Sequence, residues 1–520
     1  MAAEEKKTRR VRKKLWKNDP VTITFANKDS ICIDTDNDIF ITDPKEIEAY
    51  LSPREIGNLE MVGSDGNPND YLSQPYPNLL LKGNNLIALH SLKSRFQNKV
   101  KLIYIDPPYN TGKDTFKYND NFNHSTWLTF MKNRLQIAKE LMRDDGVIFI
   151  SLDDNEQAYL KVLCDEIFTK ENFISSIIWL KGNAQNDADT IQGNHEYILC
   201  YAKNKSQNPI YKTSYKEKVK VFFDEKAKKY YYEGSGLTTG GAGGTLNARA
   251  NLGYSIYYNP HTHDFFGLSD YDKELAKISN DEQEVYHTDL SFLEKGYKII
   301  RPPKKGVGLG CWTWALEKFN SEKDLIIIRE NSRGFCVSKK EWVDSKKVRK
   351  DENGGFYATI DKSSPPKSFI DSVGSGNGTK ELKNIFNDKV FDNPKPEKLL
   401  QRILEISTKE GDLVLDFFAG SGTTLAVAHK MGRRWIGVEQ MDYVESITKE
   451  RLKKVIEGEQ GGVSKAVEWN GGGEFVYAEI IDSAPNTATL QALEDCELEQ
   501  KEDKIYNNFE DYLKDLENDK

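Results

Sequence analysis

The chain has 520 residues, of which 38% are hydrophobic and 30% are charged, and its formal net charge is −8. This composition is typical of a water-soluble protein with two or three domains. No stretch of sequence has the length and apolarity of a membrane span, and the basic N-terminus lacks the apolar core of a secretory signal. The six cysteines are scattered without a Cys-x-x-Cys pair, which favours reduced thiols, a cytoplasmic protein and no structural zinc site.

Residues 1–75 are expected to form a leading segment, and about 1–20 of it are strongly basic. This arm is interpreted as a solubilising tail, and a phosphate-contacting arm is the alternative. Alternating strands and helices are predicted for residues 76–205. The expected strands are 100–106, 147–152, 173–180 and 196–203, and the expected helices are 126–146, ending at Gly146, and a second one capped by Asp153 or Asp154.

The alternation stops over 206–385, where tyrosine clusters, glycine runs and lysine clusters predict a separate, irregular domain. It returns over 386–482 with a helix at 396–408, a strand, turn and helix beginning at 412, a strand at 433–440, a helix at 441–457 and a last strand at 473–480. Residues 483–520 form an acidic C-terminal segment. One doubly wound, mainly parallel α/β sheet is therefore expected to be built from two separated pieces of chain.

A glycine turn, Gly420-Ser421-Gly422, joins a predicted strand to a helix start, where free backbone N–H groups and close backbone approach favour ligand binding. A phosphate loop is disfavoured because Thr423 and Thr424 stand where a lysine and a hydroxyl residue are needed. The third glycine of a dinucleotide fingerprint is replaced by Leu425. The other interpretation is an ordinary tight turn between a strand and a helix.

Two acids accompany this turn. Asp416 ends the strand before it, and Glu439 ends the next strand, where an acid commonly accepts hydrogen bonds from ribose hydroxyls. A nucleoside with a cationic tail and no phosphate fits both acids. S-adenosylmethionine is such a ligand, so the sequence predicts a site for it.

The strand 100–106 ends in Asp106-Pro107-Pro108-Tyr109. Ligands bind beyond the carboxyl ends of parallel strands, so this corner is expected to share a crevice with the glycine turn. The Asp106 carboxylate and the Pro107 carbonyl could each accept an N–H from an exocyclic amine, and Tyr109 offers a flat face to a flipped base. The alternative is a strand that ends in a proline turn with Tyr109 packed as a half-buried aromatic.

These two motifs resemble those of DNA amino-methyltransferases of the adenine-N6 type, and their order resembles the circularly permuted β class. The resemblance implies a seven-stranded methyltransferase sheet with an inserted α+β target recognition domain at 206–385. It implies catalytic roles for the four corner residues. The residues implied in cofactor binding are Asp106, Phe391, Pro394, Lys395, Pro396, Asp416, Phe417, Phe418, Ala419, Gly420, Ser421, Gly422, Thr423 and Glu439.

Longer stretches are similar to modification subunits of type III restriction systems. That similarity implies double-stranded DNA as substrate, a homodimer, and an ATP-dependent restriction subunit as a possible partner. Asp106 favours adenine over cytosine N4. A solitary methyltransferase, a cytosine-N4 enzyme, a non-catalytic DNA-specificity subunit and an RNA methyltransferase are the alternatives.

The insert offers candidate contacts to DNA. Basic candidates for phosphate contact are Lys304, Lys305, Lys346, Lys347, Arg349 and Lys350, although most lysine clusters are solvated surfaces. Tyr230–Tyr232 and Trp312–Trp314 could stack on bases, with core packing as the favoured role. No metal is expected at His261-Thr262-His263, because methyl transfer from a sulfonium requires none and no cysteine lies at zinc-ligand spacing.

Overall fold

The computed structural model describes residues 30–32, 40–41, 47–48, 50–111, 124–182, 191–238, 242–332 and 334–481. The basic arm, the acidic C-terminal segment and Gly112, the last residue of the polar turn Asn110-Thr111-Gly112 after the corner, lie outside the described residues. The chain divides into two compact units, one made of Met1–Thr213 with Pro365–Lys520, and a second of Ser214–Ser364. None of the described helices is long and apolar enough to cross a membrane.

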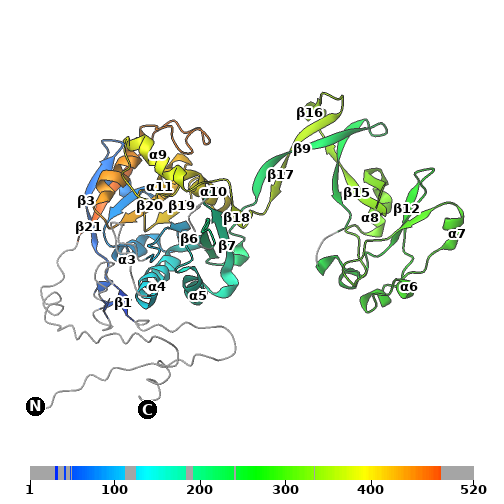
Figure 1. The fold of residues 1–520 in the computed structure, drawn as a ribbon, viewed down its shortest axis with the longest axis horizontal. Coiled ribbons are helices and arrows are strands. Elements are labelled where there is room, and N and C mark those ends of the chain that lie inside the picture. The colour runs from blue at the N-terminus through cyan, green and yellow to red at the C-terminus, as the bar shows by residue number, and fades with distance from the viewer. Residues whose placement is uncertain are drawn as a thin grey trace, which may run out of the picture. The chain divides into compact units, whose positions relative to one another are not determined.

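The first unit is built on a ten-stranded sheet with the order β18-β7-β8-β6-β5-β19-β20-β4-β21-β3 (Figure 1). Six neighbouring strands from β6 to β21 run parallel, while β8 and β3 are antiparallel to their neighbours. The strands, in chain order, are β3 Glu55–Val62, β4 Leu79–Lys82, β5 Val100–Ile105, β6 Met142–Leu152, β7 Phe173–Leu180, β8 His195–Ala202, β18 Phe369–Ile370, β19 Leu413–Asp416, β20 Arg434–Glu439 and β21 Phe475–Ile481. A short pair, β1 Ile31–Cys32 and β2 Phe40–Ile41, lies outside this sheet.

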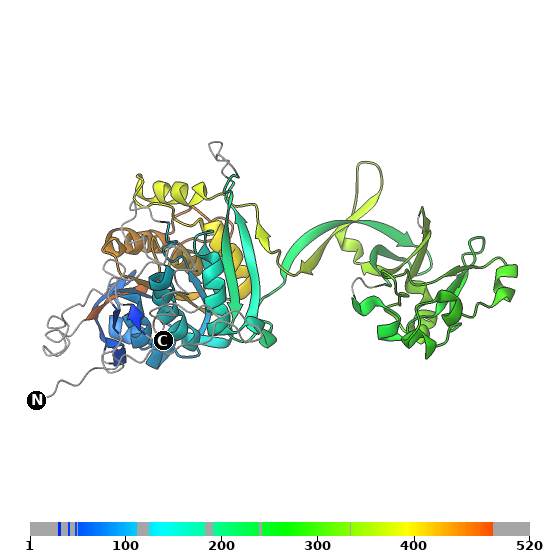
Figure 2. The same ribbon diagram turned by 60° about the horizontal axis from the view of Figure 1, so that its bottom comes forward.

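Helices cover both faces of the sheet, in two layers that both views separate (Figure 2). One layer consists of α3 Asn85–Phe96, α4 His124–Leu141 and α5 Gln157–Phe168, and the other of α10 Glu397–Ser407, α11 Thr423–Lys430 and α12 Glu450–Ile456. Each layer packs its apolar side chains into its own buried cluster. Two further helices of this unit are α2 Pro68–Leu72 and α9 Gly376–Phe386. The doubly wound α/β class is confirmed.

The sheet is larger than the seven strands expected. The seven consecutive strands from β7 to β4 are extended by β18 at one edge and by β21 and β3 at the other. β21 pairs in parallel with the free edge of β4, and β3 then pairs antiparallel with β21. β3 comes from the leading segment, so part of residues 1–75 belongs to this sheet. These additional strands satisfy backbone groups that an open edge would expose.

Three element boundaries differ from the sequence prediction. The helix expected to end at Gly146 ends at Leu141, and β6 begins at Met142. Gly146 lies in β6 where the register with β5 shifts, and a side chain there would collide with the Arg143 and Val100 carbonyls. The next helix is preceded by Glu156 instead of Asp153 or Asp154. The helix expected over 441–457 starts with a wide, π-helical turn at Val444–Lys449.

The second unit, green in Figure 2, has its own core of tyrosines, tryptophan and aliphatic side chains. It contains a six-stranded sheet, β14-β15-β10-β9-β17-β16, and a three-stranded sheet, β12-β11-β13. The strands are β9 Thr213–Asp224, β10 Lys229–Gly236, β11 Ser255–Tyr258, β12 Phe265–Leu268, β13 Lys298–Ile300, β14 Ile326–Asn331, β15 Gly334–Val343, β16 Val348–Lys350 and β17 Phe356–Ser364, and the helices are α6 Glu282–Val285, α7 Leu290–Glu294 and α8 Leu316–Ser321. This unit is shorter than the expected 206–385 because β18 and α9 belong to the first unit.

A buried charge cluster fixes the helices behind the glycine turn. Glu397 of α10 accepts bonds from Lys430 of α11 at 2.8 Å and from Arg451 of α12 at 3.0 Å. All three side chains are almost fully buried. Arg451 also donates to the Thr423 hydroxyl at 2.7 Å and to the Ser421 carbonyl at 3.2 Å. The cluster therefore links three helices to the backbone of the turn.

Replacing Glu397 with alanine leaves Arg451 buried without its carboxylate partner, while Lys430 keeps only Glu459. Removing one partner of a buried ion pair costs about 3–5 kcal/mol, so Glu397→Ala is expected to lower the free energy of unfolding by that amount in a denaturant titration. Glu457→Ala, which removes an exposed partner of Lys454, is the matched control and should leave the midpoint unchanged. Equal midpoints for the two variants would contradict this assignment.

Candidate active site

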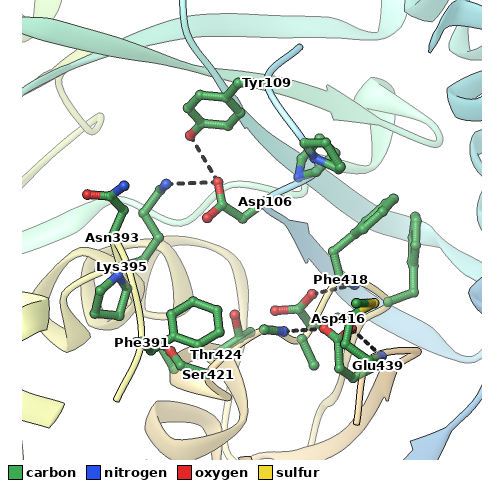
Figure 3. Close-up of a pocket in the computed structure, with 18 of the residues that line it drawn as sticks. Asp106, Tyr109, Phe391, Asn393, Lys395, Asp416, Phe418, Ser421, Thr424 and Glu439 are labelled. Atoms are coloured by element: carbon green, nitrogen blue, oxygen red, sulfur yellow. Dashed lines mark hydrogen bonds and ion pairs between the residues drawn. The ribbon is translucent and has the colours of Figure 1, made fainter. Parts of the chain in front are cut away.

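The two sequence motifs meet at the carboxyl ends of neighbouring strands. β5 and β19 are parallel, with Leu102 opposite Val414 and Ile103 opposite Leu415. The Asp106 corner follows β5, and the glycine turn follows β19. Both line one cavity of about 480 Å³, a volume within the range of small-molecule sites. Figure 3 shows side chains from both motifs around this cavity.

Two hydrogen bonds to buried residues fix the conformation of the corner. The indole N–H of Trp127, a fully buried residue of α4, donates to the Pro108 carbonyl at 2.9 Å. Asn110 has a left-handed backbone (φ 59°), and its side-chain amide donates to the buried carboxylate of Glu156 at 2.6 Å. The prolines fix their own φ angles. The direction of the Asp106 side chain and the placement of Tyr109 are therefore set by rigid neighbours.

Asp106 is in contact with a cation and a hydroxyl. Lys395 Nζ lies 2.8 Å from Asp106 Oδ1, and the Tyr109 hydroxyl donates to the same oxygen at 2.9 Å (Figure 3). Burial raises the pKa of Asp106, while the Lys395 ammonium acts in the opposite direction. Burial opposes the charge of Lys395, but Asp106 and Glu196 raise its pKa above the ordinary value. The structure thus places Lys395, which the sequence assigned to the cofactor, on the corner carboxylate.

Glu196, at the beginning of β8, is a site residue that the sequence analysis missed. Its Oε2 accepts from the Tyr109 hydroxyl at 3.0 Å and lies 3.6 Å from Lys395 Nζ. Burial opposes its ionisation, yet Lys395 and Lys181 lower the pKa of Glu196 below its usual value. The signal in the sequence is one acid next to a strongly apolar strand. Its partners lie far away in the chain, so the sequence does not show which residues Glu196 contacts.

The glycine turn brings backbone N–H groups to the cavity. Gly422 has φ 76°, and a side chain there would lie 2.9 Å from a Thr448 methyl group. Glu439 Oε2 accepts from the Gly420 N–H at 2.8 Å, and its Oε1 accepts from Gln440 and Met441 at 2.9 and 3.0 Å. Three backbone N–H groups thus donate to this carboxylate, and the Tyr443 side chain is a further hydrogen-bond partner.

Asp416 is a buried acid without a cationic partner among the described residues. Its Oδ1 accepts from the Phe418 N–H at 3.0 Å. Burial raises the pKa of Asp416 to about 7, and the negative charges of Asp106 and Glu439 contribute in the same direction. A positively charged ligand group would stabilise the ionised form. The acid therefore fits a cationic ligand better than an anionic one.

Most of the residues predicted from the sequence line the cavity. They are Asp106, Pro107, Pro108, Tyr109, Phe391, Pro394, Lys395, Asp416, Phe417, Phe418, Ala419, Gly420, Ser421, Thr423 and Glu439. Pro396 and Gly422 do not line it: Pro396 precedes α10, and Gly422 shapes the turn. Thr111, from the turn after the corner, also lines it, and the lining residues that the sequence analysis missed are Asn85, Tyr104, Phe130, Lys181, Glu196, Asp392, Asn393, Thr424, Gln440, Met441 and Tyr443.

Comparison with known proteins supports what this geometry indicates. Residues 100–450, from the corner strand to beyond the glycine turn, match the DNA methylase family of N6 and N4 enzymes. The chain belongs to this DNA methylase family. The matched range includes both motifs and the second unit.

Curated relatives include modification proteins of restriction systems. The chain is 41% identical over 486 residues to the probable type III restriction-modification enzyme HindVI Mod subunit of Haemophilus influenzae, covering 86% of this chain and 58% of that protein. It is 34% identical to the EcoPI Mod subunit of Escherichia phage P1, covering 68% and 55%. It is 31% identical to the type II methyltransferase M.KpnI of Klebsiella pneumoniae, covering 66% and 75%. The chain thus spans little more than half the length of the two Mod subunits.

Proposed function

We propose that this protein transfers a methyl group from S-adenosylmethionine to the N6 amine of a flipped adenine in duplex DNA. The observation that carries the proposal is the shared cavity. Acceptors for an amine, at the Asp106 corner, lie across one cavity from a glycine turn with two buried acids. Family membership and the Mod relatives support the same reaction.

The cavity suits the proposed cofactor. When bound, S-adenosylmethionine supplies a methyl group on a positively charged sulfur. Asp416 would face the positive charge of its methionine portion, and Glu439, at the end of β20, would accept a ribose hydroxyl. Phe391 lines the cavity next to Gly420 and contacts Tyr443 edge-to-face at 5.2 Å between ring centres. This aromatic wall would pack against the adenine ring of the cofactor.

The corner suits an exocyclic amine. Asp106 Oδ1 is occupied by Tyr109 and Lys395, and among the described residues no donor contacts Oδ2. Oδ2 and the Pro107 carbonyl would therefore each accept one N–H of the target amine, which favours a more tetrahedral and more nucleophilic nitrogen. When the amine attacks the methyl carbon, the electron pair of the methyl–sulfur bond would stay on sulfur, and the methylated nitrogen would pass its extra proton through Asp106 Oδ2 to solvent. The ring of Tyr109 would support the flipped base.

The second unit, Ser214–Ser364, is proposed to recognise the DNA sequence. Basic residues slightly outnumber acidic ones there, although the whole chain is negative. Several lysines lie over exposed or half-buried rings of its six-stranded sheet, as Lys218 does over Tyr357 at 3.9 Å. Lys304 pairs with Glu282, and the Arg349 guanidinium donates to the Lys346 carbonyl. Trp312 is buried and donates to the Tyr254 carbonyl, so it packs in the core and does not stack on bases.

We propose further that the protein is a homodimer that serves a restriction-modification system with an ATP-dependent restriction subunit. The Mod relatives support this role, because their names place them in type III restriction-modification enzymes. The likeness to a type II methyltransferase keeps an enzyme that acts without such a partner as the alternative.

Methyl transfer to DNA tests the function. Purified full-length protein with tritiated S-adenosylmethionine and unmethylated genomic duplex DNA should incorporate label, and Asp106→Ala should lower kcat by about 10²–10³-fold, as loss of a charge-stabilising group does. Asp144→Ala, which removes an exposed acid that does not line the cavity, should behave as wild type. Sequencing the DNA of an expressing host should then locate N6-methyladenine in one short motif. No incorporation, full activity of Asp106→Ala, or N4-methylcytosine as the product would each contradict the proposal.

Cofactor binding should depend on pH through Asp416. Because its pKa is about 7 in the free protein, the carboxylate is largely neutral below pH 6 and largely ionised above pH 8. A cationic ligand prefers the ionised form, so the affinity for S-adenosylmethionine measured by calorimetry should rise as pH increases from 6 to 8. Asp416→Asn should bind more weakly at pH 8 and show a flatter profile. Equal affinities at both pH values for the wild type would contradict the role of Asp416.

A further inference from the structure

The two carboxylate oxygens of Asp106 have different surroundings. Lys395 Nζ and the Tyr109 hydroxyl both contact Oδ1, at 2.8 and 2.9 Å. Both groups also contact Glu196 Oε2, at 3.6 and 3.0 Å. Lys395 and Tyr109 therefore bridge two carboxylates, and both bridges leave Asp106 Oδ2 on the other side.

We propose that Glu196 and Lys395 are positioning residues for methyl transfer, which hold Asp106 in the rotamer and charge state that present Oδ2 to the target amine. This inference rests on the proposed function. It assigns a task to an acid on β8 that comes from neither sequence motif. It also moves Lys395 from cofactor binding to control of the acceptor carboxylate.

Geometry supports this division of tasks. A carboxylate on a short side chain can rotate about its Cβ–Cγ bond, and either oxygen could then face the substrate. Two donors fixed on one oxygen suppress that rotation. Glu196 in turn fixes both donors through its Oε2. Its other oxygen, Oε1, lies 3.4 Å from Lys181 Nζ. Lys395 also lies 5.0 Å from the Tyr109 ring centre and 5.8 Å from that of Trp179, so its position is further defined by aromatic neighbours.

The tyrosine hydroxyl makes the arrangement dependent on Glu196. It has a single hydrogen, which can be donated to Asp106 or to Glu196 at one time. When Glu196 is ionised and paired with Lys395 and Lys181, it competes with Asp106 for that hydrogen. The hydroxyl oxygen lies at nearly equal distances from the two carboxylates, 2.9 Å from Asp106 and 3.0 Å from Glu196. Glu196 therefore limits how strongly Tyr109 and Lys395 neutralise Asp106, and keeps it a good acceptor.

Glu196 and Lys395 act on Asp106 with opposite signs. The charged and titratable groups that face Asp106 are Lys395 and Tyr109, with Glu196, Tyr104 and Asp416 as further neighbours. Burial raises the pKa of Asp106 most, Lys395 lowers it, and Glu196 raises it. Removing the negative charge of Glu196 should thus lower the pKa of Asp106, and removing the positive charge of Lys395 should raise it.

The test measures kcat/KM for methyl transfer to duplex DNA against pH in three full-length proteins. Relative to wild type, the acid limb should move to lower pH in Glu196→Gln and to higher pH in Lys395→Met, because Asp106 must be ionised to accept the amine. At optimal pH both variants should lose about ten- to hundredfold in kcat through misplacement of Oδ2, with KM for S-adenosylmethionine within twofold of wild type.

Matched controls separate a local effect from a general one. Glu457→Gln and Lys454→Met remove an exposed ion pair whose residues do not line the cavity and should leave the pH profile unchanged. Acid limbs that move in the same direction, or do not move, in Glu196→Gln and Lys395→Met would overturn the inference while the proposed function stands. A tenfold weaker affinity of Lys395→Met for S-adenosylmethionine would also overturn it, by returning Lys395 to cofactor binding. If the wild type transfers no methyl group, the proposed function fails, and this inference fails with it.

Discussion

The pairing of β5 with β19 is the constraint on which the rest of the site depends. The two strands come from opposite sides of the insert, and their parallel register places the Asp106 corner beside the glycine turn. Neither motif forms a site alone, since one provides amine acceptors and the other provides N–H groups and buried acids. The continuous core on both faces of the sheet holds this register, because slipping it would turn buried side chains toward solvent.

The cavity has two halves with different electrostatics. On the β5 side, Asp106 and Glu196 are balanced by Lys395 and Lys181. On the β19 side, burial raises the pKa values of Asp416 and Glu439, and neither acid has a cationic partner among the described residues. An unpaired buried carboxylate costs stability, so the second half is arranged for a ligand that brings its own positive charge. In the proposed function, a cationic cofactor would occupy the β19 side of the cavity and a neutral amine the β5 side.

Much of this site could be predicted from the sequence, because each motif is local. A few neighbouring residues determine the local geometry of each motif. These are Asp106-Pro-Pro-Tyr at the end of one strand, and the turn with Gly420 and Gly422 after the other. The Glu196 contacts could not be predicted, since they join β8 to residues on two other segments. Gly146 was interpreted as a helix stop, but backbone crowding in a shifted strand pair is what requires a glycine there. The strands β18, β4 and β3 were not predicted, because short strands and edge strands depend on tertiary contacts and leave little trace in periodicity.

The most direct test of the central claim is a crystal structure of the full-length protein bound to S-adenosylmethionine or a non-reactive analogue. The account predicts that the ribose contacts Glu439, the amino-acid portion lies toward Asp416, and the methyl-bearing centre faces Asp106 Oδ2 across the cavity. A cofactor bound outside this cavity, or one whose reactive centre points away from Asp106, would contradict the account.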